Sequence, residues 1–370
     1  MSKKILFYYQ CFGTGGAEKC SIKMLTELKK KGYDIDIVAD CPNPATFKML
    51  DGFSVDYLCQ KTYPWGSGII KQAVYLAYSK TVRLFSSGKI NKRRYDTVII
   101  GLHGTPLRYI KTKKIANRAV QFVHTDIAKM KNAKRTIEIT KKNAPYIDCY
   151  VCVSGGVYDS FVSLFPELKE KTFRIYNILD TDELRKKVNE SKNPYPSTDK
   201  PIVVTVARLS DKSKALFRMI DVCKELVDRK LDFIWYIVGN GPDEEKMKQL
   251  IDEYKINDQM VMLGYKADPI PYYKYADLTA VLSYHEGFCT VVNEAKISGC
   301  AVIATEFSAI HEQLEHGKNG YIVENEKQAI TEGMAVLLQD EELRKRITND
   351  YLSDEILDDE KKIDKLEELL

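Results

Sequence analysis

The sequence lacks any long apolar run and any regular spacing of cysteines. Of its 370 residues, 44% are hydrophobic and 29% are charged, which is typical of a globular protein. No apolar run is long enough to span a bilayer, and the first one, residues 5–9, is too short for the core of a signal peptide. The nine cysteines are an odd number without a disulfide framework, which is typical of a reducing compartment. We therefore expect a cytoplasmic protein.

Several functional motifs are also missing. Cys149 and Cys152 form a C-x-x-C, but they lie in a strand-like run, where an odd offset points side chains to opposite faces. We expect them to be buried core cysteines and not a zinc or redox site. The glycine-rich loop at residues 13–16 is not the G-x-G-x-x-G of Rossmann dehydrogenases. No nucleic-acid-binding motif is present, so we expect no nucleic acid as a partner.

The two halves of the chain carry opposite charge. Residues 1–178 contain 30 Lys and Arg against 14 Asp and Glu, and residues 179–370 contain 26 against 38. The basic residues of the first half concentrate at residues 89–94, 108–118 and 129–142, with Tyr and Met among them. Such segregation predicts an anionic partner for the first half, and we favour an anionic membrane surface or an acidic glycan.

Strand-length apolar runs alternate with helix-length amphipathic segments along the chain. The pattern begins at residues 5–10, continues with a helix over residues 17–31, and restarts after a Pro-rich stretch at residues 192–201. This alternation predicts an α/β protein with two doubly wound, Rossmann-like domains that face each other across a cleft. We expect the domains to span residues 1–178 and 196–348, and a C-terminal helix over residues 349–370 to cross back to the first domain.

Two glutamates, Glu286 and Glu294, stand eight positions apart where an apolar run passes through a polar loop into a helix. Thr290 is the expected N-cap of that helix, and Glu294 would lie one turn inside it. A helix N-terminus offers free backbone N–H groups and partial positive charge to a phosphate. Carboxylates beside a phosphate suit sugar hydroxyls, which donate hydrogen bonds. On spacing alone, two surface glutamates on an ordinary connection remain an equal alternative.

Further motifs follow one another in a characteristic order along nearly the whole chain. They are Gly13-Thr14-Gly15-Gly16-Ala17-Glu18, His124, Tyr176-Asn177-Ile178-Leu179-Asp180, Ala207-Arg208-Leu209-Ser210, Gly239-Asn240-Gly241-Pro242, the pair Glu286 and Glu294, and Gly317-Lys318-Asn319-Gly320-Tyr321-Ile322-Val323. In this order and spacing the chain resembles the retaining, GT-B-fold glycosyltransferases of family 4 (glycosyl transferases group 1). Those enzymes move a sugar from a nucleotide diphosphate to an acceptor.

The resemblance implies roles for residues around the donor diphosphate. Gly15 and Gly16 would let the backbone approach the diphosphate closely. Arg208 and a lysine that follows it would bind the diphosphate and stabilise the leaving group. The family's lysine position falls on a serine here, between Lys212 and Lys214, and we favour Lys214.

It also implies roles for residues around the sugar and the ribose. Glu294 would accept hydrogen bonds from the ribose hydroxyls, and Glu286 from the hexose hydroxyls near the reacting centre. His124 would lie near the donor sugar, with His103 as the alternative. Glu312 resembles a family element that here lacks its two glycines. The backbone N–H groups of a short loop would serve the sugar and the β-phosphate. They belong to Gly287, Phe288, Cys289 and Thr290.

The resemblance therefore implies a hexosyltransferase that uses a UDP- or GDP-sugar and no cofactor. The acceptor would be a glycan or a lipid-linked glycan of cell-surface polysaccharide synthesis, bound at the inner face of the cell membrane. We find no Asp-x-Asp motif that would hold a divalent cation on the diphosphate, so we expect the reaction to need no metal. Two alternatives are a catalytically silent GT-B subunit of another glycosyltransferase and a GT-B sugar-nucleotide epimerase.

Overall fold

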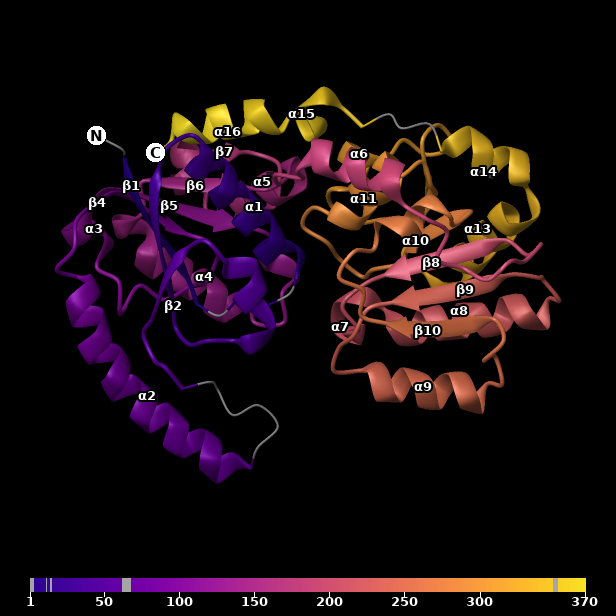
Figure 1. The fold of residues 1–370 in the computed structure, drawn as a ribbon, viewed down its shortest axis with the longest axis horizontal. Coiled ribbons are helices and arrows are strands. Elements are labelled where there is room, and N and C mark those ends of the chain that lie inside the picture. Colours follow the sequence, from indigo (N-terminus) through magenta and orange to yellow (C-terminus); the bar gives the residue numbers. More distant parts are fainter. Residues whose placement is uncertain (1–2, 11, 14, 62–67, 349–351) are drawn as a thin grey trace. The chain divides into compact units, whose positions relative to one another are not determined.

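A computed structural model describes residues 3–10, 12–13, 15–61, 68–348 and 352–370 (Figure 1). The chain divides into two compact units. The first consists of residues 1–178 and 359–370, and the second of residues 179–358. The chain therefore leaves the first unit at residue 178 and returns to it with its last twelve residues. Residues 179–195, which lie between the two domains expected from the sequence, belong to the second unit.

The first unit is built on a parallel sheet in the order β3-β2-β1-β4-β5-β6-β7. The third strand in this order, Lys4–Tyr9, pairs Ile5 with Ile35 on one side and with Thr97 on the other. Every side chain from Ile5 to Tyr9 is at most 1% exposed, because both faces of the sheet are covered. The strands are β1 Lys4–Tyr9, β2 Asp34–Ala39, β3 Ser54–Tyr57, β4 Tyr95–Ile100, β5 Ala116–Val123, β6 Cys149–Cys152 and β7 Thr172–Arg174.

Helices connect these strands in the manner of a doubly wound layer. The α-helices are α1 Gly16–Lys30, α2 Ile69–Ile90, α3 Thr112–Ile115, α4 Ala133–Asn143, α5 Gly155–Leu164 and α16 Asp359–Glu367. The short 3₁₀ helices are η1 Pro44–Leu50, η2 Ile127–Lys129, η3 Ala144–Tyr146 and η4 Pro166–Lys171. Within the part of the chain that the structure describes, no helix is both long enough and apolar enough to cross a membrane.

The helix α16 belongs to the first unit because it packs on α1. Lys31, at the end of α1, forms ion pairs with Asp364 and Glu367. The Thr97 hydroxyl of β4 donates a hydrogen bond to the Leu370 carbonyl at 2.7 Å. The last turns of the chain are thus tied to both a helix and a strand of this unit.

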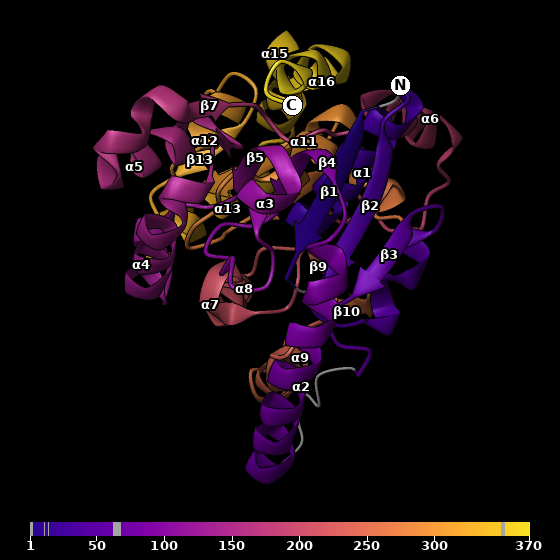
Figure 2. The ribbon, with the colours of Figure 1, turned by 90° about the vertical axis from the view of Figure 1, so that its left-hand side faces the viewer.

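The second unit repeats the architecture with a parallel sheet in the order β10-β9-β8-β11-β12-β13. The strands are β8 Ile202–Val206, β9 Ile234–Val238, β10 Met260–Gly264, β11 Leu278–Val281, β12 Ala301–Thr305 and β13 Tyr321–Val323. The helices are α6 Thr181–Glu190, α7 Asp211–Lys214, α8 Leu216–Asp228, α9 Glu244–Glu253, α10 Ile270–Lys274, α11 Thr290–Ile297, α12 Ile310–Gln313, α13 Lys327–Gln339, α14 Glu341–Ile347 and α15 Asp354–Leu357. Figure 2 shows the elements from a second direction.

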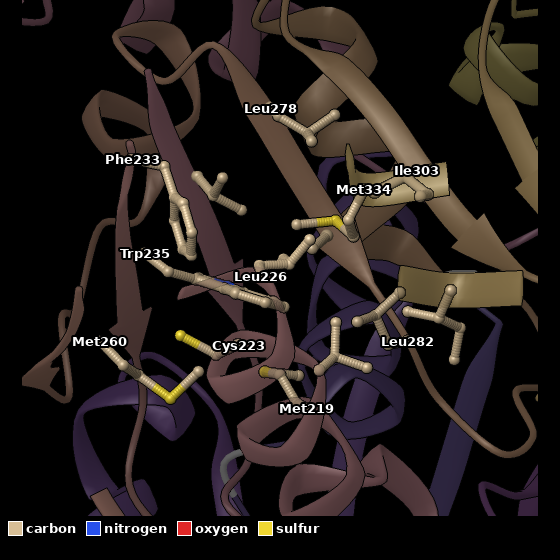
Figure 3. Close-up of a cluster of buried hydrophobic side chains, with 14 of the residues drawn as sticks. Met219, Cys223, Leu226, Phe233, Trp235, Met260, Leu278, Leu282, Ile303 and Met334 are labelled. Atoms are coloured by element: carbon tan, nitrogen blue, oxygen red, sulfur yellow. The ribbon is translucent and has the colours of Figure 1, made fainter. Parts of the chain in front are cut away.

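The core of the second unit lies between its sheet and the helices α8, α9 and α13. Figure 3 shows Leu226 of α8, Trp235 of β9 and Met334 of α13 in this cluster. Trp235 is fully buried, and its indole N–H donates a hydrogen bond to the Thr205 hydroxyl of β8 at 3.0 Å. The buried polar end of this ring is therefore satisfied, which allows so large a side chain to fill the core.

The topology predicts where each unit binds ligands. The chain builds each sheet outward from one strand, first to one side and then to the other. This strand is β1, between β2 and β4, in the first sheet, and β8, between β9 and β11, in the second. Ligands of open parallel sheets bind beyond the carboxyl ends of the strands at such a switch point. The loops that follow β8 and β11 carry Arg208 and Glu286.

Candidate functional site

A half-buried ion pair lies at the switch point of the second unit. The Lys214 ammonium contacts the Glu286 carboxylate, and the Ser283 hydroxyl donates a hydrogen bond to the same Glu286 oxygen at 2.7 Å. The two charged side chains are only 21% and 16% exposed. Burial disfavours the charge of Lys214, but the Glu286 carboxylate raises the pKa of Lys214 above its usual value. Lys214 therefore stays charged, and Glu286 is held in one position.

A break between two helices puts Lys214 in this place. The pattern of residues 214–229 predicts a single helix, but the structure has α7 and α8, separated by Ala215 in the left-handed conformation at φ 51°. The Asp211 carboxylate accepts a hydrogen bond from the Phe217 N–H at 2.9 Å, so α8 begins with a cap from α7. Lys214 therefore ends α7 and does not begin α8.

A backbone hydrogen bond joins α7 to the loop after β11. The Tyr284 N–H donates to the Ser213 carbonyl at 2.9 Å, which brings Lys214 beside Glu286. Lys212, the alternative lysine, is exposed. No ion pair or hydrogen bond of its side chain to any described residue is found. The structure thus brings Lys214, and not Lys212, to the expected glutamate.

Arg218 and Asn325 hold the loop after β11 in place through hydrogen bonds, and the sequence analysis identified neither. The Arg218 guanidinium donates to the Leu282 carbonyl at 2.8 Å and lies over the Tyr284 ring, 4.5 Å from its centroid. The Asn325 amide donates to the Ser283 and Tyr284 carbonyls at 3.2 and 3.0 Å. Asn325 follows the last family motif by two residues, but neither side chain belongs to a recognisable local pattern.

The helix α11 begins one residue earlier than expected. Thr290 is its first helical residue, and Cys289 precedes it without a side-chain hydrogen bond to the helix. Thr290 is therefore not the N-cap. The reason is a long-range contact: Gln313 of α12 accepts from the Cys289 N–H at 3.3 Å and donates to the Cys289 carbonyl at 2.8 Å. The Cys289 N–H, expected to serve the donor, already has this acceptor.

Gln313 is a structural residue that sequence reasoning missed. Besides holding Cys289, its amide donates to the Asn293 side chain in the first turn of α11 at 2.7 Å, and it is only 2% exposed. The neighbouring Glu312, to which the sequence pointed, is half-buried in the same short helix. Nothing in the local sequence distinguishes these two neighbours.

Glu294 lies on the second turn of α11, where it is half-buried. The Tyr273 hydroxyl of α10 donates a hydrogen bond to the Glu294 carboxylate at 3.1 Å. Burial raises the pKa of Tyr273 well above its usual value, and the Glu294 charge adds to the effect. Tyr273 therefore remains a donor that orients Glu294. In the loop before α11, Phe288 and Gly287 are both buried.

Arg208 lies in the loop after β8, and its side chain is exposed. That loop packs against the residues that follow β9: the Leu209 N–H donates to the Asn240 carbonyl at 2.9 Å. A Cβ atom on Gly241 would lie 2.2 Å from the Leu209 carbonyl oxygen, so only glycine fits there. The Gly239–Pro242 motif thus holds the backbone that carries Arg208.

The glycine-rich loop of the first unit contains a carboxylate. Thr14 and Cys11 lie outside the described residues. Gly15 precedes α1, and Gly16 is its first residue. The Gly13 N–H donates to the Glu18 carboxylate at 3.2 Å, and a Cβ atom on Gly15 would lie 2.7 Å from the other Glu18 oxygen. Glu18 was part of the motif, but its contact with the loop was not expected.

His124 and His103 lie together at the carboxyl ends of β5 and β4. The His124 backbone N–H donates to the His103 ring at 3.3 Å. Burial lowers the pKa of His103 to about 4, and burial followed by the His103 charge lowers the pKa of His124 to about 3. Both rings are neutral at pH 7. Neither buried ring nitrogen of His124 has a hydrogen-bond partner among the described residues.

No cation site is evident in the described part of the chain, where no three His, Cys, Asp or Glu side chains come together. The sequence contains the Asp-x-Asp pattern twice, at Asp34-Ile35-Asp36 and at Asp180-Thr181-Asp182, so the expected absence of this pattern was wrong. Asp36 accepts from the Tyr95 hydroxyl at 2.8 Å and pairs with Arg93 at 3.7 Å. It lies in β2 among these partners, away from the carboxyl end of the strand.

Cys149 and Cys152 are buried in β6, as expected, and neither forms a disulfide. Burial raises the pKa of both thiols. They are therefore inert core residues.

A family model and several relatives match the chain. Residues 186–351, which are less than half of the chain and lie within the second unit, match the family model Glycosyl transferases group 1. The putative colanic acid biosynthesis glycosyltransferase WcaL of Escherichia coli is 30% identical over 159 residues, which are 40% of this chain and 39% of WcaL, so less than half of that relative's length is matched. The Campylobacter jejuni N-acetylgalactosamine-N,N'-diacetylbacillosaminyl-diphospho-undecaprenol 4-alpha-N-acetylgalactosaminyltransferase is 25% identical over 94% of this chain and 93% of its own.

Solved structures share the fold over the whole chain. Anabaena Alr3699/HepE in complex with UDP and glucose superposes with a TM-score of 0.76 at 18% identity, over 99% of this chain and 98% of that one. A mutant of S. aureus TarM superposes with a TM-score of 0.76 at 14% identity, over 100% of this chain and 99% of that one. The chain has the GT-B fold, with two parallel-sheet Rossmann-like domains, as expected from the sequence.

Proposed function

We propose that this chain, whose residues 186–351 match Glycosyl transferases group 1, is a retaining glycosyltransferase. It would move a hexose from a UDP-sugar to a glycan or lipid-linked glycan during synthesis of a cell-surface polysaccharide. The observation that carries this proposal is the half-buried pair of Lys214 and Glu286 at the switch point beside the start of α11. A cation, a fixed carboxylate and a helix N-terminus together suit a sugar diphosphate.

Each residue of the second unit receives a role in donor binding. Lys214 has three N–H donors, so it keeps one on Glu286 and offers others to the β-phosphate. Arg208 adds a bidentate fork to the diphosphate. Glu286 accepts hydrogen bonds from the hexose hydroxyls, and Glu294 accepts them from the ribose. The roles of Gly15, Gly16 and His124 of the first unit stay predictions from the resemblance.

The proposed reaction needs no covalent intermediate and no metal. The bond between the sugar C1 and the β-phosphate oxygen breaks, and the acceptor oxygen bonds to C1 on the same face. The acceptor proton passes to the leaving phosphate oxygen. Arg208, Lys214 and the N-terminus of α11 stabilise the charge that grows on that phosphate. Glu286 is already paired with Lys214 and Ser283, which suits a hydroxyl acceptor better than a nucleophile.

The relatives support the choice of donor and acceptor. Solved structures of HepE contain UDP and UDP-glucose, which favours UDP over GDP. WcaL is named for colanic acid biosynthesis, and AmsK of Erwinia amylovora for amylovoran biosynthesis. The C. jejuni relative is named for a diphospho-undecaprenol-linked substrate, which favours a lipid-linked acceptor and a reaction at the cytoplasmic face of a membrane.

Calorimetric titration of the protein with UDP and with GDP tests the donor site. We expect UDP to bind, and both Glu294→Ala and Lys214→Met to weaken it by about tenfold or more, since a hydrogen bond to a charged group contributes about 1.5–3 kcal/mol. Lys212→Met is the matched control and should bind UDP like the wild type. If the Glu294→Ala variant folds and binds UDP as tightly as the wild type, Glu294 does not bind the ribose.

Incubation with UDP-glucose, followed by NMR of the sugar, separates the alternatives. Retained α-configuration in a product that forms only with an added glycan acceptor supports transfer. A new UDP-sugar formed without an acceptor indicates an epimerase. No UDP binding and no turnover by the wild type would indicate a silent subunit.

A further inference from the structure

The long helix α2, Ile69–Ile90, carries large apolar side chains on its exposed surface. Of thirteen large hydrophobic residues that are exposed in the described part of the chain, seven lie on this one helix. Their exposed fractions run from 43% to 86%. They are Ile69, Ile70, Val74, Leu76, Tyr78, Leu84 and Phe85. An exposed apolar patch of this kind is typical of a surface that binds a membrane, a ligand or another protein.

The side of α2 that faces the first unit carries few large apolar side chains. Its buried residues are Tyr75, Ser79, Ser87 and Ile90, which lie three, four or eight positions apart on one face of the helix, and two of the four are serines. Both serine hydroxyls bond back to the helix, to the Leu76 and Leu84 carbonyls at 3.1 and 2.9 Å. A helix that only covers a core would place its apolar residues inward, whereas most of the large apolar side chains of α2 point outward.

Specific contacts hold α2 in this orientation. Arg83 pairs with the buried Asp40 at 3.8 Å, and Asp40 accepts from the Tyr8 hydroxyl of β1 at 2.9 Å. Just past the helix, the Asn91 amide donates to the Tyr109 carbonyl at 2.8 Å. Figures 1 and 2 both show the N-terminal part of α2 running away from the sheet of this unit. These contacts therefore hold α2 so that its apolar face is turned outward.

The charge around the patch has one sign. Between Asp56 and Asp96 the sequence contains no Asp or Glu, while α2 itself contains Lys71, Lys80, Arg83 and Lys89. The three lysines are exposed. Four cations and the lack of a sufficiently apolar window keep α2 from being a helix that crosses a membrane. An apolar face with exposed lysines is typical of a helix that lies in the plane of a membrane surface.

We propose that α2 binds an anionic lipid bilayer, with Ile70, Val74 and Phe85 in the interface and its lysines at the headgroups. A second copy of the chain fits less well, because pairing two such helices would bring lysines of like charge together. This proposal stands on α2 alone and does not require the transfer reaction. If both hold, α2 places a lipid-linked acceptor within reach of the first unit.

The basic segments that the sequence analysis singled out differ from α2. The helix α4 buries Thr136, Thr140 and Asn143, and no large hydrophobic side chain of α4 is exposed in the described structure. Lys113 of the segment 108–118 is paired with Asp148. These segments add electrostatic attraction to an anionic surface, whereas α2 supplies the apolar contact that inserts.

Co-sedimentation of the whole chain with lipid vesicles tests the proposal. We expect the protein to pellet with vesicles of phosphatidylglycerol and phosphatidylcholine, and several-fold less with phosphatidylcholine alone. Val74→Glu should weaken vesicle binding by about tenfold, because it puts a carboxylate among anionic headgroups in place of buried apolar surface. Val336→Glu on α13 is the matched control, since Val336 is an exposed helical valine of the second unit, and it should bind like the wild type.

The outcomes separate this proposal from its rivals and from the proposed function. Equal recovery of Val74→Glu and the wild type on anionic vesicles would overturn it. So would a wild type that stays in the supernatant but dimerises through α2, with Val74→Glu monomeric. UDP binding by Val74→Glu, measured in the same preparation, shows whether the donor site is intact independently of the membrane result.

Hydrogen exchange of the wild type on anionic vesicles locates the contact. We expect slower exchange over residues 69–85 when vesicles are added. Slower exchange confined to residues 108–118 or 129–142 would assign the membrane surface to those segments and contradict the role of α2.

Discussion

At the scale of single residues, the partner of each charged side chain decides what it can do. Lys212 and Lys214 are two positions apart and chemically identical, yet only Lys214 pairs with Glu286. Arg208 stays exposed on a loop whose backbone is held by Asn240. Side chains of the same type therefore differ in function because the fold gives them different neighbours.

The neighbouring histidines His103 and His124 make stability depend on pH. Burial lowers both pKa values, to about 4 and about 3, from 6.5 for a free side chain. The unfolded chain therefore binds protons that the folded chain does not. The free energy of unfolding should be highest above pH 6.5 and should fall as the pH drops from 6.5 towards 4.

Unfolding temperatures of the wild type and of His124→Asn at pH 7.5 and pH 5 measure this effect. Acidification should lower the unfolding temperature of the wild type more than that of the variant, because the variant has one fewer histidine whose pKa is lowered by burial. His285→Asn, a change at a partly buried histidine of the second unit, is the control and should follow the wild type. Equal losses in all three proteins would show that burial of the His124 ring does not control acid stability.

At the scale of elements, the start of α11 is set by a neighbouring helix and not by its own sequence. Gln313 of α12 occupies the N–H and the carbonyl of Cys289 and also contacts Asn293. In the same way, glycines after β9 fit the loop that carries Arg208. Loops from adjacent strands thus support one another at the switch point.

Replacing Gln313 should destabilise the second unit. Gln313→Leu leaves buried groups of Cys289 and Asn293 without partners, so the free energy of unfolding should fall by about 1–3 kcal/mol. Urea unfolding and UDP titration are the measurements, and UDP affinity should also fall because the start of α11 shifts. Glu312→Leu is the comparison at the neighbouring position, and it should cost less than Gln313→Leu because it leaves Cys289 and Asn293 with their Gln313 partner. A larger loss for Glu312→Leu would mean that Glu312, and not Gln313, supports this helix.

At the scale of the whole chain, the last twelve residues belong to the unit in which the chain begins. Buried Ile363 and Leu366 of α16 face the first unit, and the Lys362 ammonium donates to the Asn177 carbonyl at 3.0 Å. Lys31 at the end of α1 pairs with Asp364 and Glu367 of the same helix. The first unit is therefore completed by residues that follow the entire second unit in sequence.

Loss of the α16 contact should weaken the first unit. Leu366→Ala removes a side chain that is 1% exposed, and the free energy of unfolding should fall by about 2–5 kcal/mol. Thermal unfolding with hydrogen exchange of β1 and β4 would measure the loss in the first unit. Glu368→Ala, at an exposed position of the same segment, should leave the stability unchanged. An unchanged exchange rate in β1 for Leu366→Ala would show that α16 is not part of the folded first unit.

Local pattern was sufficient for much of the fold. Continuous apolar runs such as residues 5–9 and 278–282 indicate strands buried on both faces, and both became strands of parallel sheets. The position of Glu286 in the loop before a helix, and of Glu294 inside that helix, was predicted from the sequence. Features that depend on distant residues were not visible: Glu18 folding back onto Gly13, the break at Ala215, and Gln313 instead of Glu312.

The amino-acid order by itself determined the alternation of strands and helices, the two Rossmann-like halves and the position of the motif residues, because these follow from periodicity over a few neighbouring residues. Only the tertiary structure decided which lysine meets Glu286, which amide holds Cys289, and which face of α2 is turned outward. Those choices depend on contacts between residues that are far apart in the chain, and a one-dimensional pattern contains no information about which distant groups will meet.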